Sequence, residues 1–290
     1  MPSTDSTRTP RTFGVEFEVT ANVTREEMAR LMQAAGLTAR VASYSGNAYD
    51  VWQIKTDASL SGRNAMEIVS PTLDWYNTAE VARQFAALAH AFQRGGVRVN
   101  DSCGGHVHLY VGDLTGPQVA ALVARYVNRQ RSFIDPLAGR MPGRWAQPVT
   151  RADGRDWGAY IDNGNRTQVG YFDRYRTINP QHYPSRGTFE FRQGTGRDSA
   201  EVMLGWVGVL VALVEAARTE ADVTVPNGSA VETHLAALVA AGLLAPHLAR
   251  WVRGDLSVET LTDIAGDVQA EAVATVREAL PNLFRLQGLR

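Results

Sequence analysis

The stretch Thr12–Thr20, TFGVEFEVT, decides the fold of this chain. Apolar residues alternate with glycine, acidic and threonine residues along it, which is the pattern of a strand with one buried face. Side chains two residues apart on a strand share a face, so Glu16 and Glu18 point together, away from the apolar side chains. The stretch therefore predicts a strand with one packing face and one acidic face.

Two later stretches repeat this design and place further ionisable side chains in pairs. They are GHVHLYV at Gly105–Val111, which pairs His106 with His108, and TFEFRQ at Thr188–Gln193, which pairs Glu190 with Arg192. A single charged strand face is ordinarily a solvated surface. Three such faces in one chain predict a shared site on one side of a sheet.

The remaining periodicity predicts helices and strands in mixed order. Helices are expected over Arg25–Ala35, Thr78–Arg94, Val119–Phe133 and Ser199–Arg218, and further strands over Val51–Thr56, Met66–Ser70 and Tyr175–Asn179. Strands that follow one another as pairs favour an antiparallel sheet over a doubly wound parallel one. We expect an α+β protein whose curved, mainly antiparallel sheet is backed by helices.

Composition divides the chain into three regions. Residues 1–11 are polar and predict a flexible tail, residues 12–220 carry the mixed pattern of a main domain, and residues 221–290 predict an Ala-rich, helical C-terminal extension. Residues 139–170 have little periodicity and several Gly and Arg residues. A loop of that length inside a domain is usually functional, so we expect a mobile segment that covers the substrate.

The composition excludes several classes of protein. With 290 residues, 44% hydrophobic and 20% charged, the chain is neither disordered nor collagen-like. Its longest apolar run, Val202–Val214, is too short to span a bilayer, and the polar first residues show no signal peptide. A single cysteine, Cys103, excludes an internal disulfide. Together these features favour a cytoplasmic protein without a membrane partner.

Charge is unevenly distributed. The formal net charge is -1, yet residues 125–197 hold 13 Arg against 6 acidic residues. This basic region indicates either a locally held anion, such as nucleotide phosphates, or a solvated face. The neutral total disfavours a nucleic-acid partner, and the oligomeric state stays open.

The paired carboxylates point to a metal site. Like charges two residues apart repel unless a cation lies between them, and oxygen-rich sites with an occasional imidazole suit Mg²⁺ or Mn²⁺. Zinc hydrolases also use a His-x-His pair, so a metal-dependent hydrolase acting through His106 and His108 is an alternative. A catalytically inactive, nucleotide-binding module of the same fold is a further alternative.

Other candidates flank these strands. Lys55, Asp57 and Ser59 occur in IKTDASL, Glu67 in MEIVSP, and Arg174, Arg176 and Asn179 in DRYRTINP. Alternation places Glu67 on the polar face, opposite Met66 and Ile68. Arginine forks and a lysine are what a transferring phosphoryl group requires.

Six motifs, in order, resemble the amidoligase family over about residues 12–218: GVEFEV, TDASL, EIVSP, CGGHVHL, RTINP and GTFEFRQGT. That family belongs with the glutamine synthetase and glutamate–cysteine ligase group of carboxylate–amine ligases. The resemblance implies a glutamine synthetase-like catalytic fold and an enzyme that uses ATP and Mg²⁺ (or Mn²⁺).

The resemblance also implies roles for individual residues. The implied metal ligands are Glu16, Glu18, Glu67, His106 and Glu190. His108 resembles a residue near the nucleotide, Arg192 a phosphate-contacting arginine, and Arg176 and Asn179 phosphate or substrate contacts. With Lys55 and Asp57, the two arginines form the expected catalytic set.

The implied reaction is amide-bond formation through an acyl phosphate. A carboxylate is a poor acylating agent, so ATP first phosphorylates it and an amine then attacks. The expected substrates are a carboxylate and an amine, each a small molecule or a peptide. The 139–170 segment matches no motif, and its expected role is to determine the substrate and exclude water.

Overall fold

The computed structural model describes residues 10–43, 50–129 and 144–219. The C-terminal extension expected over 221–290 and most of the expected N-terminal tail lie outside these residues. None of the described helices is long and apolar enough to cross a bilayer.

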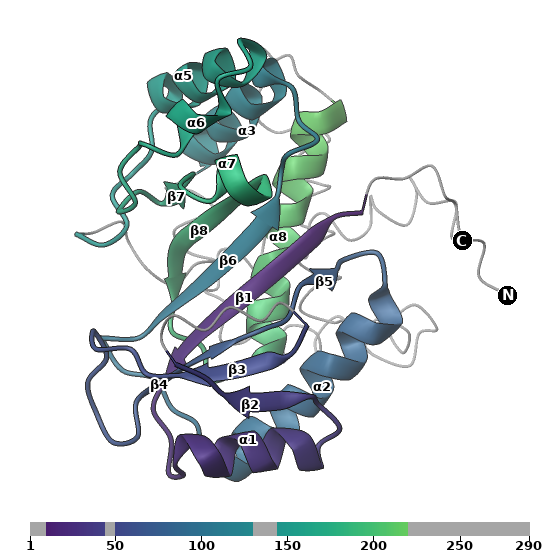
Figure 1. Cartoon of the computed structure of the whole chain (residues 1–290), viewed down its shortest axis with the longest axis vertical. Coiled ribbons are helices and arrows are strands. Elements are labelled where there is room, and N and C mark those ends of the chain that lie inside the picture. The colour runs from purple at the N-terminus through teal and green to yellow at the C-terminus, as the bar shows by residue number, and fades with distance from the viewer. Residues whose placement is uncertain (1–9, 44–49, 130–143, 220–290) are drawn as a thin grey trace, which may run out of the picture.

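The described residues form a sheet of eight strands, with neighbours in the order β2-β3-β4-β1-β6-β8-β7 and β5 paired to β1 (Figure 1). The strands are β1 (Thr12–Val19), β2 (Ala39–Val41), β3 (Trp52–Lys55), β4 (Met66–Val69), β5 (Leu73–Asp74), β6 (Gly104–Tyr110), β7 (Ile178–Asn179) and β8 (Thr188–Thr195). Only β2 and β3 pair in parallel. The mainly antiparallel sheet expected from the sequence is confirmed.

Helices cover one face of this sheet. The described helices are α1 (Arg25–Ala34), α2 (Thr78–Gly95), α3 (Gly116–Arg129), α5 (Arg151–Asp162), α6 (Arg166–Val169), α7 (Tyr183–Arg186) and α8 (Ala200–Thr219). The apolar side chains of β1 pack with those of α1, α2, α3 and α8 in one core. Figure 1 shows α8 passing behind β6 and β1, so the opposite face of the central strands is left to the polar side chains.

Local sequence explains where these elements begin and end. Thr24 caps α1, and Thr24 and Glu27 exchange side-chain hydrogen bonds with each other's backbone. Gly96 ends α2 in the left-handed conformation that favours glycine. The alternation in β1 buries Phe13, Val15 and Phe17 against the helices, as the sequence predicts.

The prediction of a long loop over residues 139–170 is wrong for much of that range. Residues 151–162 form α5, which has a capping box of its own, and residues 166–169 form α6. Trp157 is fully buried, and a Cβ on Gly154 would lie 2.6 Å from Val123 of α3. Because α5 is packed this closely on α3, it is part of the core and no mobile cover. Residues 139–143 lie outside the described part.

Arg11 corrects the boundary of the expected tail. Its side chain is buried and forms ion pairs of 2.8 Å with both Asp113 and Glu215. The chain is therefore anchored from Arg11 onward. The polar composition of residues 1–11 predicts a flexible tail that includes Arg11. The sequence does not reveal its two ion-pair partners, because they lie 102 and 204 positions away.

The strand expected over Tyr175–Asn179 is shorter than predicted. Only Ile178 and Asn179 pair with β8. Just before them, Gln147 donates to the carbonyl of Tyr175 at 2.6 Å and accepts from the backbone of Thr177 at 2.7 Å. A short bridge to residue 147 therefore replaces the first part of the expected strand.

Candidate active site and metal-binding face

The ionisable residues converge because their strands place them in register. Three cross-strand pairs carry the convergence: Glu16 with His106, Glu18 with Glu67, and His108 with Glu190. Lys55 pairs with Glu67 on one side of the sheet and Asn179 pairs with Glu190 on the other. Directly opposed residues have Cβ atoms about 5 Å apart, so these pairs form one continuous polar surface across six strands, from β3 to β7.

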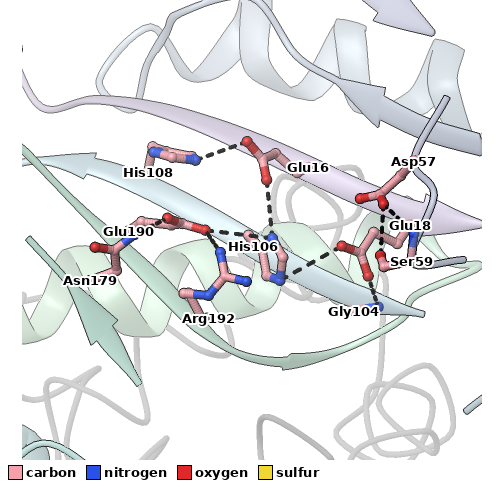
Figure 2. Close-up of polar contacts among 10 residues, drawn as sticks. All are labelled: Glu16, Glu18, Asp57, Ser59, Gly104, His106, His108, Asn179, Glu190 and Arg192. Atoms are coloured by element: carbon pink, nitrogen blue, oxygen red, sulfur yellow. Dashed lines mark hydrogen bonds and ion pairs between the residues drawn. The ribbon is translucent and has the colours of Figure 1, made fainter. Parts of the chain in front are cut away.

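Glu16 lies at the centre of this surface and contacts both histidines (Figure 2). Its Oε2 is 3.0 Å from His106 Nδ1 and its Oε1 is 3.0 Å from His108 Nε2. Glu190 approaches from the other side, with Oε1 3.6 Å from His106 Nδ1. One donor atom each from Glu16, His106 and Glu190 lies within 4.8 Å of the others, a spacing that could hold a metal ion.

A second group of donors lies toward β4. One carboxylate oxygen each from Glu18, Asp57 and Glu67 lies within 4.8 Å of the others. Glu18 accepts a hydrogen bond from the backbone of Gly104, and Asp57 accepts two from Ser59, both at 2.7 Å. These bonds fix two of the three carboxylates. The structure thus brings Asp57, expected to be catalytic, among the carboxylates expected to bind metal.

Glu190 is held by two further side chains. Asn179 Nδ2 donates to its Oε2 at 2.6 Å, and Arg192 Nη1 contacts its Oε1. The register between β6 and β8 shifts opposite His106, where two β8 residues face one β6 residue. Such bulges re-aim side chains beside active sites. Here the bulge includes Arg192.

Mutual attraction determines the charge of the central groups. Burial disfavours the ionised form of Glu16, but the neighbouring His108 and His106 outweigh it and hold the pKa of Glu16 well below its usual range. The same balance lowers the pKa of Glu190. In return, although burial opposes their charged forms, contacts with Glu16 raise the pKa of both His106 and His108.

Glu67 behaves in the opposite way. Burial, followed by the negative charge of Glu16, raises the pKa of Glu67 to about 8. A carboxyl group that is difficult to ionise among other carboxylates is one that a bound cation would stabilise. The two donor groups, with five carboxylates and the imidazole of His106, therefore fit a divalent metal with a preference for oxygen.

A pocket of about 450 Å³ opens beside this cluster. Its lining combines Glu16 and His108 with the cationic side chains of Lys55 and Arg186 and with several hydroxyl groups. Gly14 contributes to the lining and carries no side chain, so it leaves space on the polar face next to Glu16. This pocket can hold an anionic ligand directly against the donor cluster.

Two predicted site residues lie elsewhere. Arg176 Nη1 donates to the carbonyl of Pro148 at 3.0 Å and its Nη2 lies 4.0 Å from Asp153, so it is not brought to the cluster. Arg174 stacks over Tyr175. The expected grouping of Arg176 with Asn179 is therefore corrected: residues three apart on an extended segment point to opposite sides.

Sequence reasoning missed two residues that the structure brings to the site. His182 and Arg186 both line the pocket, from just before α7 and from its last residue. Burial and the proximity of His108 lower the pKa of His182. Their spacing of one helical turn was a signal, but the four-residue α7 is too short to predict from periodicity.

The family model described as "Putative amidoligase enzyme" matches residues 9–151, from β1 through α3. No curated protein matches the sequence. Among solved structures, a chain in the crystal structure of the complex between prokaryotic ubiquitin-like protein Pup and its ligase PafA is similar, with a TM-score of 0.37 and 12% identity.

That alignment covers 95% of this chain and 65% of the chain it matches, so this protein spans less than two thirds of that relative. The likeness is too distant to bear on activity or substrate. The family match, by contrast, contains three of the motif strands and the residues Glu16, Glu18, Glu67, His106 and His108. The resemblance seen in the motifs is confirmed over residues 9–151, the part of the chain that matches the amidoligase family model.

Proposed function

We propose that this protein is an ATP- and Mg²⁺-dependent carboxylate–amine ligase that forms an amide bond through an acyl phosphate. The observation that carries the proposal is the convergence of Glu16, His106 and Glu190, from three different strands, beside a second group of three carboxylates. The amidoligase family match supports the reaction class. The same match favours a ligase over the metal-dependent hydrolase that a His-x-His pair alone would allow.

Magnesium would be held by the two donor groups described above. When bound, it would neutralise the phosphates of ATP and stabilise charge on the transferred phosphoryl group. Glu16 and Glu190 would serve one ion with His106, and Glu18, Asp57 and Glu67 would serve another. The backbone bond to Glu18 and the Asn179 bond to Glu190 orient these ligands in advance.

The nucleotide would occupy the pocket beside Glu16. Pockets of this size hold ligands as large as a nucleotide, and His108, Lys55 and Arg186 give this one a cationic lining. The carboxylate substrate attacks the γ-phosphorus of ATP, ADP leaves, and an acyl phosphate remains. The amine then attacks the carbonyl carbon, phosphate leaves with the original carboxylate oxygen, and the amine nitrogen loses a proton.

Arg192 is suited to stabilise the transferring phosphoryl group. Its Nη1 contacts Glu190, which fixes the guanidinium beside the Glu16–His106–Glu190 group. Within the described residues its buried Nε makes no hydrogen bond, so one donor of the fork is not used inside the protein. A buried donor without a partner is costly, and a phosphoryl oxygen would satisfy it.

The test is product formation from a panel of carboxylates and amines. Amino acids and short peptides are supplied in pairs with ATP and Mg²⁺, ADP release is measured, and mass spectrometry seeks a product equal to both substrates minus one water. Glu190→Gln is the inactive control. The proposal predicts ADP release that requires both substrates and Mg²⁺. ADP release without a condensed product would contradict it.

A further inference from the structure

His182 is the one histidine at the site that none of the functions above uses. It precedes α7, lines the pocket with His108 and Glu16, and its ring centroid is 5.4 Å from that of His108. Among the described residues its ring makes no hydrogen bond, and it gives α7 no side-chain cap. Its ring nitrogens are therefore available to a ligand that enters the pocket.

The two imidazoles meet Glu190. One ring nitrogen from each of His108 and His182 and one carboxylate oxygen of Glu190 lie within 4.8 Å of one another. Metal bonds of about 2.1 Å place tetrahedral ligand atoms about 3.4 Å apart, so distances within the group must shorten by up to about 1.4 Å. Glu190 is buried and held by Asn179 and Arg192, whereas His182 is half-buried and unattached. Rotation of the His182 side chain would bring its ring nitrogen to the distance from His108 and Glu190 that a shared ion requires.

We propose that His108, His182 and Glu190 form a separate cation site that prefers Mn²⁺ or Zn²⁺ to Mg²⁺. Two imidazole nitrogens and one oxygen are a softer set than the carboxylate group of Glu18, Asp57 and Glu67. This composition selects ions that bind nitrogen well, whereas Mg²⁺ keeps oxygen ligands and water.

The proposed site borders the pocket, so a ligand bound in the pocket can supply the fourth ligand of the ion. Three protein ligands leave an open position, as in zinc sites that bind water or substrate. Both histidines line the pocket, so an anion bound there would reach the ion directly. The site shares only Glu190 with the Glu16–His106–Glu190 group, so its occupancy can be measured separately. The inference rests on these three side chains and needs no ligase activity.

Metal binding by the full chain tests this inference without ATP or substrates. Protein stripped with a chelator is titrated with Co²⁺, a visible-absorbing substitute for Zn²⁺, and separately with Zn²⁺ by calorimetry. His182→Ala should remove one bound ion or weaken its binding at least about tenfold, with loss of part of the Co²⁺ absorption. His106→Asn is the matched control, because it removes one imidazole from the neighbouring group and leaves all three proposed ligands.

His182→Asn, which keeps a polar side chain of similar reach, guards against misfolding, and the metal-free melting temperature of each variant is compared with that of the wild type. If Zn²⁺ stoichiometry and Co²⁺ absorption are the same in both His182 variants as in the wild type, the proposal is wrong. It is also wrong if the wild-type protein binds no Co²⁺, or if only His106→Asn loses an ion. Failure of the ligase assay would not change any of these results.

Discussion

Glu16 and His106 face each other across β1 and β6, and their side chains meet with Glu16 Oε2 3.0 Å from His106 Nδ1. The other oxygen of Glu16 reaches His108 at the same distance. A single carboxylate thus joins two histidines that lie on the same face of the next strand. This contact also explains why Glu16 is ionised: although burial raises its pKa, the interactions with His108 and His106 lower the pKa well below its usual range.

Arg192→Lys tests whether the arginine fork acts in catalysis. Lysine keeps the positive charge near Glu190 but loses the planar fork, so turnover should fall on the order of 10²-fold while the KM for ATP changes less. Steady-state ADP release at saturating ATP measures this. If Arg192 only holds Glu190 in place, Arg192→Ala should lower the melting temperature and Arg192→Lys should retain near-normal turnover.

The strand alternation allowed most of this face to be predicted. Local pattern alone placed Glu16, Glu18, His106, His108 and Glu190 on polar faces, because period-two alternation is a local property. The sheet order that aligns those faces came only with the structure, since strand pairing joins residues far apart in sequence.

The misses have the same physical origin. The resemblance implies that Arg176 and Asn179 both contact phosphate or substrate, yet Arg176 bridges to Gln147 and its side chain lies 4.0 Å from Asp153. His182 was missed because it acts from a loop and a four-residue helix, where no periodicity exists to read. The residues 139–170 appeared irregular because the helical period of α5 is interrupted by glycines that permit its close contact with α3.

Glu67 should make the metal-free protein sensitive to pH. Its pKa is raised in the folded state to about 8, so folding binds a proton that the unfolded chain has already lost above its ordinary value of 4.5. Stability from this group is therefore complete at low pH and falls as pH rises from about 5 through 8. In chelator, Glu67→Gln should become more stable relative to the wild type across this window, as measured by melting temperature. A pH-independent difference would contradict the assignment.

Gly14→Val tests the pocket. A Cβ at Gly14 would meet only Ser70 Oγ, at 3.6 Å, so alanine fits there without strain. Valine would extend into the 450 Å³ space beside Glu16 and should raise the KM for ATP by about tenfold or more, with little change in melting temperature. Gly14→Ala is the matched control and should bind ATP nearly normally. Equal ATP affinity in all three proteins would place the nucleotide elsewhere.

Arg11→Met should destabilise the fold. It leaves the carboxylates of Asp113 and Glu215 without their buried partner, which costs about 3 kcal/mol. Burial alone would raise the pKa of Glu215, but its bonds to Arg11 outweigh burial and lower it. The stabilisation is therefore present at neutral pH and is lost as pH falls below about 4.5. Urea unfolding at pH 7 and pH 3.5 should show a large difference from the wild type only at pH 7.

The most direct measurement of the central claim is the melting temperature with ATP in the presence and absence of magnesium. If the converged carboxylates hold the ion that binds ATP, saturating ATP with Mg²⁺ should raise the melting temperature by about 5 °C. ATP in excess chelator should leave it nearly unchanged, as should ATP with Mg²⁺ on Glu16→Gln. Equal stabilisation by ATP with Mg²⁺ and by ATP in chelator would contradict a metal-dependent nucleotide site on this face.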